Sequence, residues 1–177
     1  MKAPKPFPSL PAGWTSWDKI MERAYVQAAL AAENGEVPVG AVIISPDGEI
    51  LAEAANAPIS TNDPTAHAEI LALRLAAEKI QNYRLTDCIA AVTLEPCIMC
   101  LGAFIHARIG GLVFGADDPK SGAVVSCLDG ANLDFVNHHF PVMRGVMAEE
   151  CSEQLRAFFK ARRKKKKAEQ NPSPLAE

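Results

Sequence analysis

Apolar positions along the chain follow two patterns. Some segments repeat every three to four residues, which is typical of helices with one buried face, and others are short runs rich in β-branched residues, which favour strands. The helical pattern covers Ile20–Ala32, about 65–80, about 96–107 and Ala148–Lys167. Strands are predicted at Val37–Ser45, Glu49–Ala55, Ile89–Leu94, Leu112–Phe114 and Val142–Val146. Strands that alternate with helices indicate a layered α/β domain.

Local signals support these boundaries. Thr15 and Asp18 have the spacing of a capping box before the first helix, and Thr65 is a candidate cap for the second. The turn residues Pro46-Asp47-Gly48 join the first two strands into a hairpin. A polar loop is predicted over 56–64, and Pro96 suits the first turn of the third helix.

The length of 177 residues fits one domain. We expect a Pro-rich disordered arm over 1–14, a folded domain with a C-terminal helix over 15–163, and a basic, then Pro-containing tail over 164–177. The chain has no apolar run near the ~20 residues of a membrane helix. It also lacks a signal-like apolar segment after Met1, so we expect a cytoplasmic protein that does not enter membranes.

Charge is unevenly distributed. The net charge is −3, but residues 160–167 hold seven basic side chains and no acidic one. The rest of the chain has eleven basic and 21 acidic side chains, which gives it a net charge of −10. The basic run is either a contact for nucleic acid or a solvated helix end that aids solubility.

The cysteines indicate a metal site. Their number is odd, five, which argues against a disulfide framework in a chain without a signal segment. Cys97 and Cys100 lie three residues apart at a predicted helix start, so both sulfurs can reach one ion, and the helix N-terminus favours their thiolate forms. A redox pair or two buried cysteines are the alternatives.

His67, at the start of another predicted helix, is the natural third ligand. Zinc binds sulfur and imidazole nitrogen in a tetrahedron, and three protein ligands with one water make a catalytic site. The chain has no second Cys-x-x-Cys pair to close a structural site. The remaining cysteines and His106 are expected to be packing or surface residues, namely Cys88, Cys127 and Cys151.

Glu69 follows His67 by two residues, so both can flank a site beyond the helix start. A carboxylate beside a zinc-bound water can take its proton and deliver it later. A His/Cys/Cys zinc site with a neighbouring Glu that is not a ligand is the known signature of nucleobase deaminases. The His-x-Glu pair alone is weak evidence, but the ordered combination is strong.

The sequence resembles the bacterial tRNA adenosine deaminases of the cytidine deaminase superfamily. The resemblance spans about 18–163 and rests on GEVPVGAVI (35–43), NDPTAHAEILALR (62–74), NYRL (82–85), VTLEPCIMCLGAFIHARI (92–109) and FGADDPKSGA (114–123). It implies a cytidine deaminase-like three-layer α/β/α fold with a five-stranded mixed sheet. It also implies a homodimer with one Zn²⁺ per subunit, bound by His67, Cys97 and Cys100, with Glu69 as the proton carrier.

The same resemblance implies an activity and a partner. The expected reaction is hydrolytic deamination of adenosine to inosine at the wobble position of a tRNA anticodon stem-loop, with arginine tRNA as substrate. Zinc-bound hydroxide would attack C6, and ammonia would leave. The residues implied in substrate binding are Asn56, Asp118, Lys120, Ser121 and Phe159.

Other functions remain open. From the sequence alone Asn56 is also an ordinary turn residue, the 118–121 loop a surface turn, and Phe159 a core residue. A deaminase of guanine or a cytosine nucleotide would act without RNA and leave the basic run without a role. A zinc-stabilised binding subunit would not need Glu69.

Overall fold

A mixed five-stranded sheet forms the centre of the molecule, in a computed structural model that describes residues 6–170. The strands are β1 (Gly40–Ile44), β2 (Ile50–Ala55), β3 (Ile89–Leu94), β4 (Gly111–Ala116) and β5 (Val142–Arg144). Their order in the sheet is β2-β1-β3-β4-β5. β1 is antiparallel to β2 and β3, whereas β3, β4 and β5 run parallel. The predicted five-stranded mixed sheet is confirmed.

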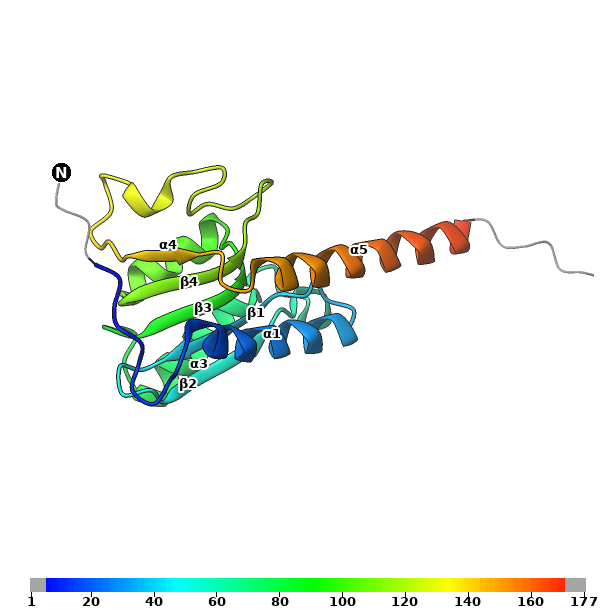
Figure 1. Cartoon of the computed structure of the whole chain (residues 1–177). Helices are drawn as coiled ribbons and strands as arrows, with labels where there is room; N and C mark the ends of the chain where they lie inside the picture. The colour runs from blue at the N-terminus through cyan, green and yellow to red at the C-terminus, as the bar shows by residue number, and fades with distance from the viewer. Residues whose placement is uncertain (1–5, 171–177) are drawn as a thin grey trace, which may run out of the picture.

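Helices cover both faces of this sheet (Figure 1). One face carries α1 (Trp17–Glu33) and α5 (Ala148–Gln170), and the other carries α3 (Ala68–Ile80) and α4 (Ile98–Ala107). The predicted polar loop over 56–64 contains a further short helix, α2 (Pro58–Thr61). The three predicted layers are therefore present.

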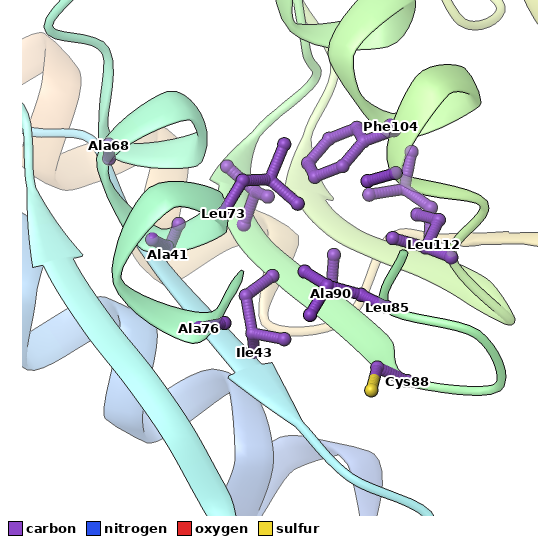
Figure 2. Close-up of a cluster of buried hydrophobic side chains, with 14 of the residues drawn as sticks. Ala41, Ile43, Ala68, Leu73, Ala76, Leu85, Cys88, Ala90, Phe104 and Leu112 are labelled. Atoms are coloured by element: carbon purple, nitrogen blue, oxygen red, sulfur yellow. The ribbon is translucent and has the colours of Figure 1, made fainter. Parts of the chain in front are cut away.

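Each face of the sheet has its own core. Ala41 and Ile43 of β1 point toward α3 and α4, while Val42 and Ile44 point toward α1. Figure 2 shows the first core, in which Phe104 of α4 and three side chains of α3 lie over the middle strands. Because both faces are covered, β1 and β4 are buried along their whole length, and the sequence of each reads as a continuous apolar run.

Two predicted caps are wrong. Ser16, and not Thr15, caps α1, since its hydroxyl accepts the N–H of Lys19 at 3.2 Å. Thr65 does not cap α3, which begins at Ala68 with His67 in the cap position. The N–H and the hydroxyl of Thr65 instead donate to Asp63, each at 2.7 Å, and this fixes the turn that precedes His67.

The chain ends also differ from the expected arm and tail. Residues 6–14 lie against the α1 side of the sheet, where the ring of Phe7 meets that of Trp17 edge-on, with centroids 5.2 Å apart. The indole N–H of Trp14 donates to the Gly48 carbonyl at 3.0 Å, so aromatic contacts anchor a segment that its prolines had suggested to be disordered. α5 runs through the basic run, as predicted as far as Lys167, and continues to Gln170. Residues 1–5 and 171–177 of the predicted arm and tail lie outside the described residues.

Among the helices formed by residues 6–170, none is both long and apolar enough to span a membrane.

Close packing of α1 on β1 depends on Gly40. A Cβ atom at this position would lie 2.0 Å from the backbone oxygen of Ala24 and 2.5 Å from the backbone nitrogen of Ala28. We therefore expect Gly40→Ala to lower the free energy of unfolding by about 2 kcal/mol or more, measured by denaturant titration. Gly102→Ala is the matched control, because no atom lies within 4 Å of its new Cβ and a helix interior favours Ala by about 0.5–1 kcal/mol. Equal stability of the two variants would contradict this account.

Candidate active site

The residues expected to bind metal meet at the carboxyl ends of the parallel strands. His67 occupies the N-cap position of α3. Cys97 occupies the N-cap position of α4, three residues after the end of β3 at Leu94, and Cys100 lies in the first turn of α4. In open α/β sheets, ligands bind at this edge, beyond the carboxyl ends of the strands.

Three potential ligand atoms face one another at nearly equal distances. The Sγ atoms of Cys97 and Cys100 are 3.7 Å apart, and His67 Nδ1 lies 3.7 Å from the first and 3.6 Å from the second. A tetrahedral zinc ion with Zn–S bonds of about 2.3 Å would hold two sulfurs about 3.8 Å apart. This triangle therefore fits one tetrahedral ion, and within residues 6–170 no other group of three His, Cys, Asp or Glu side chains gathers in this way.

A cavity of about 450 Å³ opens beside this triangle. His67, Glu69 and Cys97 line it, whereas Cys100 is fully buried behind them. Each residue that sequence comparison implied in substrate binding also lines the cavity, namely Asn56, Asp118, Lys120, Ser121 and Phe159. They come from the end of β2, the loop after β4 and the middle of α5, so the fold brings together residues more than 100 positions apart.

Comparison with known proteins identifies the family. The profile of the MafB19-like deaminases matches residues 15–163. A protein of Haemophilus influenzae named tRNA-specific adenosine deaminase is 49% identical over 152 residues, which cover 86% of this chain and 88% of the relative. The chain belongs to the tRNA-specific adenosine deaminase family.

Solved structures agree with this assignment. A structure from studies of A-to-I editing by tRNA:A34 deaminases at the wobble position of transfer RNA matches with a TM-score of 0.75 and 42% identity. The match covers 77% of this chain and 99% of that one. A guanine deaminase from Bacillus subtilis matches with a TM-score of 0.57 and 31% identity over 85% of this chain and 95% of its own. The cytidine deaminase-like fold is thereby confirmed.

Glu69 of the deaminase is buried next to the ligand triangle. Its side chain is 4% exposed, and Oε2 has no hydrogen-bond partner. Burial raises the pKa of this carboxyl above its ordinary value, because the low-dielectric surroundings disfavour the charged form. An unpartnered buried carboxylate oxygen costs folding free energy, so its presence beside three ligand atoms indicates a functional position.

The ligand triangle itself favours a thiolate at Cys97. The Cys100 thiol and then the His67 ring hydrogen-bond to this sulfur, which lowers the pKa of Cys97 to about 4. The bond to Cys97 in turn raises the pKa of His67. A thiolate is the form that binds metal, so the lowered pKa of Cys97 favours the binding of a cation at this sulfur.

Sequence reasoning missed part of the cavity. Val37, Val39, Leu94 and Leu155 give it apolar walls, and Glu95 lies between Leu94 and the Pro96-Cys97 turn. Glu95 is 2% exposed, although it is charged. A charged residue placed between a buried strand and a metal-ligand turn is a signal that could have found it.

The cysteines outside the triangle behave as expected for packing and surface positions. Cys88 and Cys151 are buried, and Cys127 is exposed. Burial raises the pKa of the Cys88 thiol to about 11 and that of Cys151 to about 12, so both remain neutral thiols at ordinary pH.

These pKa values predict an order of alkylation. In protein stripped of metal with a chelator, Cys97 should react with iodoacetamide at pH 7.5, where it is a thiolate, while Cys88 and Cys151 should stay unlabelled until unfolding. Peptide mass spectrometry after timed labelling measures each site, and Cys127 reports the rate at an exposed thiol. If Cys88 were labelled as fast as Cys97, the thiol pKa values of the two residues would not differ as described.

Proposed function

We propose that this chain converts adenosine to inosine at the wobble position of a tRNA anticodon by hydrolysis, with arginine tRNA as the substrate. The observation that carries the proposal is the buried Glu69 with its unpartnered Oε2, next to a triangle of metal ligands in a cavity large enough for a base. Higher identity to the tRNA deaminase structure, 42%, than to the guanine deaminase, 31%, supports RNA as the substrate class.

His67, Cys97 and Cys100 would hold one Zn²⁺ per subunit. The near-equal separations of their three ligand atoms and the two sulfur donors suit this ion. When bound, zinc activates water for attack at neutral pH.

Glu69 would carry the protons of the reaction. Hydrolysis adds water at C6 of adenine and releases ammonia, so a proton must leave the water and others must reach the ring nitrogen and the departing amino group. Oε2 is free to accept a proton, and the raised pKa of the carboxyl lets Glu69 hold that proton before returning it. Burial also keeps bulk water away from the exchanging proton.

The cavity walls would select a planar base. Val37, Leu94 and Leu155 offer apolar surface to its faces, and the ring of Phe159 stands at the rim with 39% of its surface exposed. Asn56 is 8% exposed, and its amide can both donate to and accept from the edge of a base. A base extruded from a loop would thus find both stacking and hydrogen-bonding partners.

Phosphate contacts would come from the basic groups near the cavity. Lys120 is exposed at its rim, and α5 leads from Phe159 directly into the exposed basic run of residues 160–167. Figure 1 shows this part of α5 projecting beyond the sheet. In a chain whose other residues carry a charge of −10, this is where a polyanion would bind.

The proposal includes a homodimer whose second subunit helps to shape the RNA site. Large apolar side chains stand exposed close in sequence to site residues: Ile59 on α2, three residues after Asn56, has 57% of its surface exposed, and Ile98 on α4, next to Cys97, has 61%. Exposed apolar groups of this size favour burial against another subunit.

A direct assay tests the activity. We expect inosine to form when the zinc-loaded protein is incubated with an anticodon stem-loop of arginine tRNA that carries adenosine at the wobble position, measured by nucleoside mass spectrometry. Parallel reactions contain adenosine, guanine and deoxycytidylate. These should stay unchanged, because they are too small to reach the basic run and the cavity rim, which would hold a polynucleotide. Turnover of guanine with an inert stem-loop would instead assign the protein to the deaminases of small molecules.

The role of Glu69 has its own test. Glu69→Gln keeps the shape of the side chain but cannot take up a proton, so we expect kcat on the stem-loop to fall by about 100-fold or more. Zinc content, measured by atomic emission, should stay at one ion per chain, because Glu69 is not a ligand. Glu78→Gln, on the exposed side of the same helix, is the control and should match the unmodified protein. Full activity of Glu69→Gln would refute the assignment.

A further inference from the structure

Glu95 is a buried carboxylate that the reaction itself does not use. It follows β3 and is 2% exposed. Its Oε1 accepts three backbone N–H groups, from Val124 at 3.1 Å, Val125 at 2.7 Å and Ser126 at 2.9 Å. Its Oε2 accepts the backbone N–H of Asp118 at 3.0 Å and the hydroxyl of Ser126. One side chain thus holds both ends of the loop that follows β4.

This loop is wrapped closely around the carboxylate. The N–H of Gly122 donates to the Asp118 carbonyl at 2.9 Å, and that of Ala123 donates to the Pro96 carbonyl at 2.9 Å. A Cβ atom on Gly122 would lie 2.3 Å from Glu95 Oε2, so only glycine allows the backbone to approach so near. Converging backbone N–H groups of this kind form a site for an anion, which Glu95 supplies from within the chain.

The held loop forms one wall of the cavity. Asp118, fixed by Glu95 through its N–H, accepts the N–H groups of Lys120 at 3.0 Å and Ser121 at 3.3 Å through Oδ1. Its Oδ2 accepts the Ser121 hydroxyl at 2.6 Å. The hydrogen bonds therefore run from Glu95 to Asp118 and on to the residues at the rim.

We propose that Glu95 is a positioning residue for the RNA substrate: by holding the loop 117–126 it sets the shape of the wall that receives the nucleotides beside the target adenosine. The inference rests on the proposed function. It assigns Glu95 to substrate binding and not to the chemical step, because its two oxygens are occupied by the loop and Glu69 supplies the free carboxylate oxygen.

Glu95→Gln separates these roles. The amide oxygen can still accept the three N–H groups that Oε1 binds, but the amide nitrogen meets the N–H of Asp118 as a second donor, so this end of the loop is released. We expect KM for the stem-loop to rise about tenfold or more with kcat changed by less than about threefold, and zinc content to stay at one ion per chain. Amide exchange at residue 118 should be faster, while exchange in β1 and β3 stays slow.

Two further variants make the result decisive. Ser126→Ala removes one donor to Oε2 without placing a new donor there, so KM should rise about two- to fivefold with kcat unchanged. This variant still tests the inference if Glu95→Gln folds poorly. Glu53→Gln, which loses a carboxylate bonded to Arg23 outside the cavity, should leave KM unchanged.

An unchanged KM in both Glu95→Gln and Ser126→Ala would overturn the inference, as would a loss confined to kcat in Glu95→Gln. An unmodified protein that does not deaminate the stem-loop would refute the proposed function instead. The two failures are therefore distinguishable.

Discussion

The position of the site depends on how closely α3 packs against the sheet. Ala68, Ala72 and Ala76 repeat every four residues along one side of this helix, and each is completely buried. Small side chains let the helix axis approach the strands, and Figure 2 shows Ala68 and Ala76 among the buried side chains of this core. Because Ala68 is held against the sheet, its neighbours His67 and Glu69 are held at the helix start. The small buried side chains of α3 thus help to position the residues that carry the chemistry.

Two buried carboxyl groups at this edge of the sheet differ in how many hydrogen bonds they accept. Glu95 receives five donors and its pKa is lowered, in spite of burial, by the Ser126 hydroxyl and the backbone N–H groups that it accepts. Glu69, in the first turn of α3, has a free oxygen and a raised pKa. The pKa values of two buried glutamates in one cavity thus shift in opposite directions, because one carboxylate is fully hydrogen-bonded and the other is not.

Most correct predictions came from patterns within short stretches of sequence. The strands and long helices followed from apolar period, and the metal triangle followed from His67, Cys97 and Cys100 at helix starts, because ligand spacing is a short-range property. The place of Glu95 beside the metal-ligand turn is a local signal, but its role could not be predicted, since its partners lie more than 20 residues away and all but the Ser126 hydroxyl are backbone groups. The cap at Ser16 and the packed arm around Trp14 depended on neighbours that residue type alone does not reveal.

Helix α5 joins the wall of the cavity to the basic run in one continuous helix. Leu155 and Phe159 belong to the cavity wall, and the next turns carry the basic run. A helix rises about 1.5 Å and turns about 100° per residue, so each cation has a set height and bearing relative to the cavity. The eleven residues from 160 to 170 extend about 16 Å past the wall. Inserting a single residue after Phe159 would keep every charge and yet rotate the whole set by more than a quarter of a circle, so that the spacing along α5 is itself a feature of the site.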